Sequence, residues 1–318
     1  MTKTSGTVVF FGNERLATGV TTSAPTLRAL IDAGYDVACV ITNYPDIQSR
    51  HRRELEIIEV ARQHNIPVWL PDKLSDVKRK LETTGATLGV LAAYGKIVPQ
   101  NIIDLFSNGI INIHPSLLPK HRGPTPIESV LLSGEAVTGV SLMMLANRLD
   151  AGPVISQRKI RLNHQESKQS LAERLIKLGA DILIQHLPDI MNGNATTTPQ
   201  NDSDATYDRL IEKNDGAIDW QKPAAQLERE VRAYLGWPKS RCDLDNKKFI
   251  ITAAKVSDDR QNDLNRIAGT PLKLSRNTFG VQTVQGVLEI EKLKPEGKSE
   301  MTAQAYLAGY GQRLKLVT

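Results

Sequence analysis

Three polar side chains in the sequence have the types and spacing of an acyl-transfer site. Asn112 and His114 alternate in "IINIHPS", and Asp150 lies in "NRLDAGPV". Residues i and i+2 of a strand face the same way, so the Asn112 amide and the His114 imidazole can both donate to a developing oxyanion. A carboxylate can orient the imidazole, and the glycine two residues after Asp150 lets a substrate approach the backbone. The set indicates stabilisation of a tetrahedral intermediate.

Covalent catalysis by a serine is the less favoured route. The sequence has no G-x-S-x-G elbow, and Ser116 in "HPS" has no base at a recognisable spacing. Asn, His and Asp at strand ends are also common turn and capping residues, so each of them alone is more typical of local structure. Their combination at one sheet edge favours catalysis by direct attack of a bound nucleophile.

The elements that must position these residues follow from the spacing of the apolar side chains. Up to residue 116, apolar strand-like runs alternate with amphipathic stretches. Strands are predicted at 7–12, 36–42, 66–71, 86–95 and 110–116, and helices at 23–34, 53–65, 74–85 and 99–109. This alternation predicts βαβ crossovers and an α/β fold with a doubly wound, mostly parallel sheet. Such sheets bind their ligands at the carboxyl ends of the strands, where Asn112 and His114 lie.

Three parts of the chain are predicted from the change of pattern. A long helix at about 170–192 closes the first part, and the polar, turn-rich stretch 193–206 has no apolar period. The remainder begins with a helix, "PAAQLEREVRAYL", and continues as short strand-like runs separated by Gly, Pro and Asn, which is typical of a small β-barrel or sandwich. We therefore predict a catalytic domain at 1–192, a linker at 193–206 and a β-barrel domain at 207–318.

Composition excludes some classes of protein and allows others. The 318 residues are 40% hydrophobic and 24% charged, as in ordinary globular proteins. No apolar run approaches the roughly 18 residues of a membrane span, and no signal peptide is recognisable, so we expect a cytoplasmic protein. The spacing of Cys39 and Cys242 suggests neither a disulfide framework nor a zinc site. Residues 206–318 carry 19 Lys and Arg against 15 Asp and Glu, which allows a polyanionic partner without requiring one.

Longer motifs carry a resemblance to a known family. "NIHPSLLPKHRGPTPIE" and "TGVSLMMLANRLDAGPV" look like the catalytic signature of the 10-formyltetrahydrofolate-dependent formyltransferases. "VVFFGNERLA", "LAAYGKIVP", "YDRLIEKNDGAIDWQKPAAQLEREVRAYLGWP" and "TAQAYL" extend the match in order from about Thr7 to Leu316. Over this length the sequence resembles the methionyl-tRNA formyltransferases. The resemblance implies a Rossmann-like formyltransferase domain and an OB-like C-terminal domain that binds tRNA.

The resemblance also implies roles for particular residues. The catalytic set would be Asn112, His114 and Asp150. The turn that holds tetrahydrofolate would comprise Ser116, Leu117, Leu118 and Pro119, beside a wall formed by Tyr94, Gly95 and Lys96. The tRNA-binding residues would be Arg50, Arg52, Arg53, Lys120 and Arg122, of which the last two could touch the folate tail instead. The match is weakest in "SRHRRE", which lacks the family's glycine, so a solvated helix N-terminus is an alternative for that cluster.

The implied activity is formylation of the free α-amino group of methionine on initiator methionyl-tRNA, for translation initiation. The formyl donor would be 10-formyltetrahydrofolate, and no metal would be needed. The implied partners are the initiator tRNA and the folate, with no membrane, and we expect a monomer.

Three other interpretations remain open at the level of sequence. A formyltransferase that acts on an amino sugar nucleotide would share the "SLLP" and "DAG" elements, although the complete "DGAIDW" to "GWP" segment and the basic C-terminal part count against it. A non-catalytic RNA-binding protein could keep the same scaffold, but the complete Asn-His-Asp set argues against decay. A dinucleotide-dependent oxidoreductase is disfavoured because "GNERLATG" lacks the G-x-G-x-x-G pattern.

Overall fold

The chain forms two compact units in a computed structural model that describes residues 6–43, 55–257, 267–311 and 314–317. The first unit comprises Met1–Ile127, Ala136–Leu162 and Gln169–Arg209. The second comprises Glu128–Glu135, Asn163–Lys168 and Leu210–Thr318. The basic cluster predicted to bind tRNA, Arg50, Arg52 and Arg53, lies outside the described residues.

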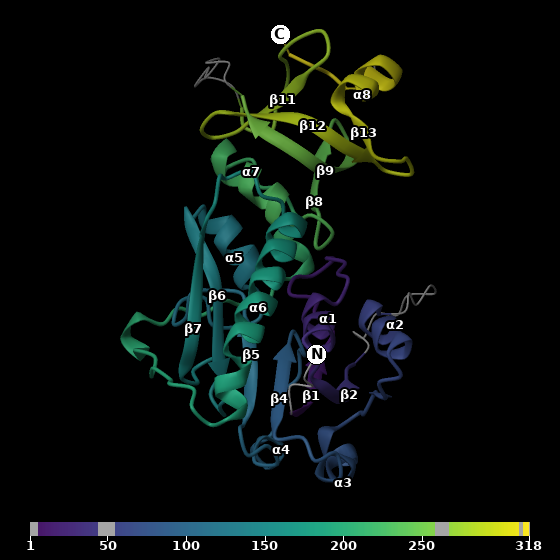
Figure 1. The fold of residues 1–318 in the computed structure, drawn as a ribbon. Coiled ribbons are helices and arrows are strands. Elements are labelled where there is room, and N and C mark those ends of the chain that lie inside the picture. Colours follow the sequence, from purple (N-terminus) through teal and green to yellow (C-terminus); the bar gives the residue numbers. More distant parts are fainter. Residues whose placement is uncertain (1–5, 44–54, 258–266, 312–313, 318) are drawn as a thin grey trace. The chain divides into compact units, whose positions relative to one another are not determined.

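A seven-stranded sheet with the order β3-β2-β1-β4-β5-β6-β7 is the centre of the first unit (Figure 1). Its strands are β1 (Thr7–Gly12), β2 (Asp36–Ile41), β3 (Val68–Trp69), β4 (Leu88–Ala92), β5 (Ile110–His114), β6 (Val137–Met144) and β7 (Val154–Arg161). The pairs among β1 to β5 are parallel, whereas β6 and β7 each run antiparallel to the preceding strand. The order reverses between β1 and β4, which confirms the predicted doubly wound, mostly parallel sheet and places β5 beside the switch point.

The helices of this unit are shorter than the sequence pattern predicts, except for the long helix α6. They are α1 (Pro25–Asp32), α2 (Glu56–Gln63), α3 (Lys78–Glu82), α4 (Gln100–Ile103) and α6 (Lys168–Met191), whose first residue is grouped with the second unit. The helix predicted at 99–109 is a single turn. It ends early because the chain then turns inward and buries Phe106, whose ring meets that of Phe11 edge to face at 5.9 Å.

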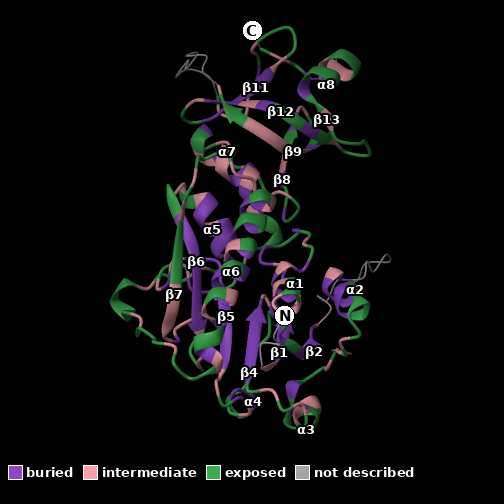
Figure 2. Ribbon diagram, viewed as in Figure 1, coloured by how far each residue is buried: buried purple, intermediate pink, exposed green. Residues whose placement is uncertain are grey.

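Burial is concentrated on the strands that carry the site. All five residues of β4 and all five of β5 are buried, as Figure 2 shows by their uniform colour. Beside β4, the rings of Phe11 and Tyr94 meet edge to face at 6.0 Å in a cluster that also contains Cys39. Burial raises the pKa of the Cys39 thiol to about 12, so this cysteine is a small apolar core residue at neutral pH.

Helix α6 lies against β5 through a glycine, and this contact provides a test of how tightly the site strand is packed. A Cβ added at Gly179 would lie 2.5 Å from Cγ2 of Ile113, which stands between Asn112 and His114. We expect Gly179→Ala to lower the free energy of unfolding by about 1 to 3 kcal/mol in urea titrations, because a closely packed core resists added volume.

The matched control for that substitution is Gly309→Ala in the C-terminal helix. Apart from its neighbours in the chain and the backbone of its own helix, no described atom lies within 4 Å of the added Cβ there. Alanine should therefore raise the unfolding free energy by about 0.5 to 1 kcal/mol through its better helix propensity. An equal loss of stability in both variants would contradict the close packing at Gly179.

The second unit is built on an antiparallel sheet with the order β10-β11-β12-β9-β8, to which β13 adds beside β12. Its strands are β8 (Ser240–Leu244), β9 (Lys247–Val256), β10 (Pro271–Lys273), β11 (Phe279–Gln282), β12 (Val287–Pro295) and β13 (Met301–Thr302). Helices α5 (Pro126–Ser133, from Glu128 onward), α7 (Ala224–Ala233) and α8 (Ala303–Tyr310) belong to it. The sheet curls (Figure 1), which agrees with the predicted small C-terminal barrel.

Aromatic side chains hold the core of the second unit together. The ring of Tyr306 from α8 lies 5.5 Å from that of Phe249 on β9 and 6.2 Å from that of Phe279 on β11. The β8–β9 hairpin turns through Asp245 and Asn246, both with positive φ (49° and 60°). Asp and Asn tolerate this left-handed conformation better than most residues, so these two types at the tip permit the short turn.

Candidate active site

Strand β5 presents Asn112 and His114 at the carboxyl edge of the sheet, where the loop between β6 and β7 supplies Asp150. The Asn112 amide nitrogen Nδ2 donates to Asp150 Oδ1 over 3.3 Å, and His114 Nδ1 lies 3.7 Å from Asp150 Oδ2. Asn112 and His114 are 7% and 4% exposed, so solvent reaches little of either side chain. The structure thus brings together the three side chains that the sequence singled out.

The hydrogen bonds of His114 assign different tasks to its two ring nitrogens. Nε2 lies 2.8 Å from the backbone carbonyl of His121, and a carbonyl oxygen can only accept, so Nε2 carries a hydrogen. Nδ1 is then the position that can gain or lose a proton. It faces the Asp150 carboxylate at a distance slightly longer than a hydrogen bond, which is within the range of an ion pair.

Asp150 is held by its neighbours in a conformation that it would not adopt freely. Its φ is +45°, in the left-handed region that costs a non-glycine residue about 1 kcal/mol or more. The N–H of Gly123 donates to its Oδ2 over 2.9 Å, and Nε2 of Gln200 donates to its backbone carbonyl over 2.8 Å and to that of Gly152 over 2.7 Å. Gly152 is required by space, because a Cβ would lie 1.9 Å from the carbonyl oxygen of Met144.

The turn formed by Ser116, Leu117, Leu118 and Pro119 follows β5 and contains a cis peptide bond before the proline. The Ser141 hydroxyl on β6 donates to the Ser116 carbonyl over 2.7 Å and accepts from the N–H of Leu118 over 3.0 Å. Nε2 of Gln157 on β7 donates to the Leu118 carbonyl over 2.8 Å. The Ser116 hydroxyl itself donates to the Lys120 carbonyl over 2.7 Å, so its hydrogen stabilises the turn.

Tyr94, Gly95 and Lys96 follow the neighbouring strand, β4, and have unequal surroundings. Tyr94 is 1% exposed, its ring packs in the core, and burial raises the pKa of its phenol. Its hydroxyl has no hydrogen-bond partner among the described residues. Gly95 has φ of +72°, which suits glycine, and the exposed Lys96 donates to the Asp72 carbonyl over 3.3 Å. The backbone of this loop, together with Lys96, is the part open to a ligand.

The burial of Arg122 contradicts its predicted contact with RNA. Its side chain is fully buried, and its Nε and Nη2 donate to Gln200 Oε1 over 3.1 and 2.9 Å. Nη1 donates to the Tyr207 hydroxyl over 2.9 Å, and Nη2 forms an ion pair with Asp202 over 2.9 Å. A guanidinium without exposed surface cannot bind an RNA phosphate, so Arg122 is a structural residue. Lys120, by contrast, is exposed.

Several residues that support this site were missed by the sequence analysis. Gln200, Tyr207 and Asp208 lie in or just after the stretch predicted to be a linker, and Ser141 and Gln157 lie on strands that were not assigned. Their side chains are unremarkable in type. One signal in the sequence was the glycine that follows Arg122, because a glycine can mark a close backbone contact. A Cβ at Gly123 would lie 2.6 Å from the Asp208 carbonyl oxygen.

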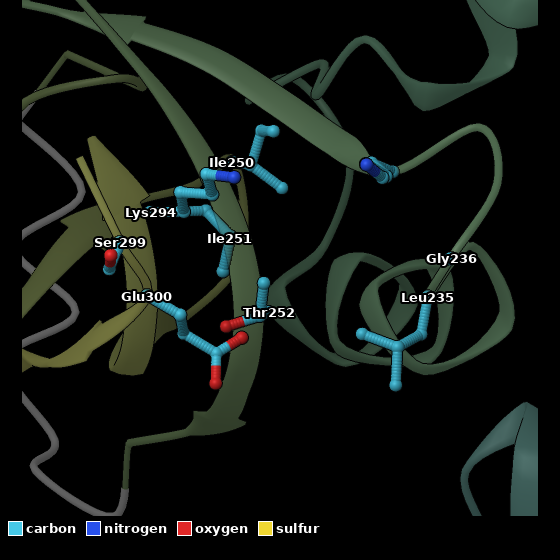
Figure 3. A pocket seen from close by; sticks show the side chains of 9 residues that line it. Leu235, Gly236, Ile250, Ile251, Thr252, Lys294, Ser299 and Glu300 are labelled. Carbon is cyan, nitrogen blue, oxygen red and sulfur yellow. The ribbon is translucent and has the colours of Figure 1, made fainter. Parts of the chain in front are cut away.

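A pocket of about 400 Å³ lies in the second unit. Figure 3 shows Ile250, Ile251 and Thr252 of β9 in its lining, with Lys294 and Glu300 nearby. Lys239 also lines it, and neither lysine has an ion-pair partner among the described residues. The lining thus combines two ammonium groups with the Glu300 carboxylate and the hydroxyls of Thr252 and Ser299.

Two features are absent from the described residues. These residues include no group of three or more His, Cys, Asp or Glu side chains arranged to hold a metal ion. Within the same residues, no helix is both long and apolar enough to cross a membrane.

Comparison with known proteins identifies the class that this fold and site define. The formyl transferase family matches residues 3–187, and the formyl transferase C-terminal domain family matches residues 210–311. The methionyl-tRNA formyltransferase of Chloroflexus aurantiacus is 37% identical over 290 residues, covering 89% of this chain and 92% of its own. That of Thermodesulfovibrio yellowstonii is 33% identical over 309 residues, covering 96% of each chain. The chain therefore belongs to the formyltransferase family, among the methionyl-tRNA formyltransferases.

A solved structure supports the fold at greater evolutionary distance. HypX from Aquifex aeolicus, crystallised in complex with tetrahydrofolic acid, superposes with a TM-score of 0.65 at 16% identity. The match covers 98% of this chain and 48% of that one. At this identity the likeness concerns the fold.

Proposed function

We propose that this enzyme transfers the formyl group of 10-formyltetrahydrofolate to the α-amino group of methionine on initiator methionyl-tRNA, in the cytoplasm, for translation initiation. The observation that carries the proposal is the convergence of Asn112, His114 and Asp150 at the carboxyl edge of β5. Near full-length similarity to methionyl-tRNA formyltransferases supports the choice of acceptor.

The chemistry of the three side chains follows from their positions. The uncharged α-amine attacks the formyl carbon and forms a C–N bond, and the carbonyl oxygen becomes an oxyanion. The Asn112 amide and a proton on Nδ1 of His114 stabilise that oxyanion, and Asp150 attracts the same proton. When the bond to N10 of the folate breaks, the amine gives up a proton and N10 gains one, for which Nδ1 is the available carrier.

The folate would lie between two loops that follow adjacent parallel strands. The turn Ser116–Pro119 comes after β5, and the loop Tyr94–Lys96 comes after β4, so both leave the same edge of the sheet, where Asn112 lies. The two leucines of the turn offer apolar contact and the backbone of both loops offers polar groups, which is a composition that suits a flat heteroaromatic ring. We assign Ser116, Leu117, Leu118, Pro119, Tyr94, Gly95 and Lys96 to this donor site.

The tRNA would be bound by basic residues of both units of one protomer. We retain Lys120, Arg50, Arg52 and Arg53 from the sequence prediction, and remove Arg122 because it is buried. We also propose that residues 207–318 form the tRNA-binding domain, in which Lys239 and Lys294 at the pocket would contact phosphates.

The lysine pair gives a prediction that can be measured by salt dependence. Replacing both Lys239 and Lys294 with Gln should weaken tRNA binding and lower the slope of log K against log salt by about 2, or about 1 for each lost phosphate contact. A double variant of the first unit, Lys159→Gln with Lys177→Gln, removes the same net charge and should keep the slope. Equal slopes in the wild type and the Lys239 and Lys294 variant would place the phosphate contacts elsewhere.

The experiment that tests the proposed function is a transfer assay with alternative acceptors. The protein is incubated with 10-formyltetrahydrofolate and either methionyl-tRNA, uncharged tRNA or an amino sugar nucleotide, and the formylated products are counted. We expect formylation of methionyl-tRNA alone. Transfer to the sugar alone would reject the proposal in favour of the sugar-nucleotide class, and binding of tRNA without any transfer would favour a non-catalytic RNA-binding protein.

A further inference from the structure

The stretch predicted to be a linker is part of the first unit, and it touches the candidate active site at several points. We call residues Thr198–Arg209 the strap. At its beginning, Thr198 exchanges two backbone hydrogen bonds of 2.8 Å with Val154, the first residue of β7. Near its end, Asp208 donates its N–H to the Arg122 carbonyl over 2.8 Å, and the N–H of Arg122 donates to the Thr206 carbonyl over 2.9 Å. The strap is therefore bound to the first residue of β7 and to the loop after β5.

One strap side chain reaches the backbone of the catalytic aspartate. A single amide, that of Gln200, donates from Nε2 to the carbonyls of Asp150 and Gly152 and accepts at Oε1 from two nitrogens of Arg122. Both hydrogens of the amide nitrogen are thus donated to the turn that holds Asp150. The bonds to Arg122 fix the orientation of the amide, because only its oxygen can face the guanidinium.

A second connection runs from the strap to the catalytic histidine. His121 Nδ1 lies 3.1 Å from Asp208 Oδ1, and the N–H of His121 donates to the Thr206 hydroxyl over 2.8 Å. The carbonyl of the same His121 accepts from His114 Nε2. Both members of the His114 and Asp150 pair are therefore fixed by residues that the strap holds.

We propose that Gln200 is a positioning residue of the formyl-transfer reaction, which keeps Asp150 in its left-handed conformation and at its distance from His114. The inference rests on the proposed function. Asp150 is strained at φ of +45°, so the turn needs hydrogen bonds from residues outside it to persist. The two hydrogen bonds from Gln200 reach the carbonyls of Asp150 and Gly152, the residues on either side of Ala151. Gln200 touches no reacting atom. Its loss should slow the chemical step and leave substrate binding in place.

Two substitutions separate the donor role of Gln200 from its packing. Gln200→Glu keeps an acceptor for Arg122 but offers no hydrogen to the two carbonyls, and Gln200→Met keeps the approximate volume without either function. For both variants we expect kcat of formyl transfer to fall by about 10- to 100-fold, since small misplacements of catalytic groups cost this much. The KM values for tRNA and folate should stay within about threefold. Circular dichroism and the melting temperature establish that each variant is folded.

Gln157 offers a matched contrast in the same unit. Its Nε2 also donates two hydrogen bonds, to the Leu118 carbonyl and to the Ser141 hydroxyl, over 2.8 Å each, but these hold the turn assigned to the folate. Gln157→Met should raise the KM for 10-formyltetrahydrofolate more than it lowers kcat. Gln185→Glu, at an exposed position of α6 in the first unit, should change neither constant.

The outcomes distinguish the inference from the function on which it rests. Wild-type protein that transfers no formyl group to methionyl-tRNA contradicts the proposed function itself. Active wild-type protein with a folded Gln200→Met variant of equal kcat contradicts only the role of Gln200. A rise in KM without a fall in kcat, or the same kinetic pattern for the Gln157 and Gln200 variants, would likewise show that Gln200 does not act on Asp150.

Discussion

Replacing His114 with glutamine is expected to lower kcat of formyl transfer by about 10²- to 10⁴-fold while the protein remains folded. The glutamine amide can still donate to the His121 carbonyl, which the imidazole Nε2 bonds over 2.8 Å. It has no group that can take up and release a proton opposite Asp150. The loss would therefore report the chemistry of Nδ1 rather than the loss of a structural contact. Single-turnover transfer to methionyl-tRNA measures the effect without interference from product release.

Two comparisons define what this result means. His64→Gln, at an exposed position after α2, should leave kcat unchanged. Asp150→Asn should be nearly as damaging as His114→Gln, and the double variant should be little worse than either, because groups that act as a unit are not additive. Fully additive losses, or a folded His114→Gln variant with wild-type kcat, would contradict the assignment of these residues to one reacting set.

Replacing Arg122 with methionine is expected to lower the free energy of unfolding by about 1 to 3 kcal/mol, the range for leaving a buried hydrogen-bond partner unsatisfied. Methionine fills much of the volume but leaves Gln200 Oε1 without its guanidinium donors, and the Tyr207 hydroxyl keeps only its interaction with Arg148. The ring of Tyr207 also loses the cation that lies 5.7 Å from its centre. Urea unfolding of the full chain measures the change.

The control for Arg122 is provided by a second arginine on the same carboxylate. Arg148 bonds Asp202 over 2.8 Å, as Arg122 does over 2.9 Å, but its side chain is 66% exposed. Arg148→Met should leave stability almost unchanged, because exposed ion pairs are weak. The salt slope of tRNA binding should be the same for Arg122→Met as for the wild type wherever both are folded. Equal destabilisation by the two substitutions would show that burial of Arg122 contributes little.

The pattern of apolar residues was sufficient to predict the parallel half of the sheet and the antiparallel C-terminal unit. It failed where the chain departs from regular periods. Strand β7 carries Gln157, Arg158 and Lys159 at consecutive exposed positions, so the alternation that marks a half-buried strand is absent there. The helix predicted at 99–109 ended after Ile103 because burial of Phe106 outweighed the continued helical period.

The catalytic candidates could be identified from residue type and spacing because oxyanion donors and a carboxylate must lie at a strand end. The supporting residues could not. Gln200 is 50 positions from Asp150 in sequence, and its function depends on two carbonyls that only the folded turn places within reach. Arg122 appeared to be a surface cation because its sequence neighbours are basic, whereas its environment is created by residues about 80 positions away.

The placement of the strap also bears on how proteins of this architecture can diversify. A polar, turn-rich stretch is normally expected to tolerate a junction between two domains. Here Asp208 pairs with the loop after β5 and Gln200 with the backbone of Asp150, so a recombination joint at the end of α6 would separate Asp150 from the glutamine that supports it. Exchange of C-terminal modules would preserve the reaction centre only if the crossover fell after residue 209, at the border where the second unit resumes.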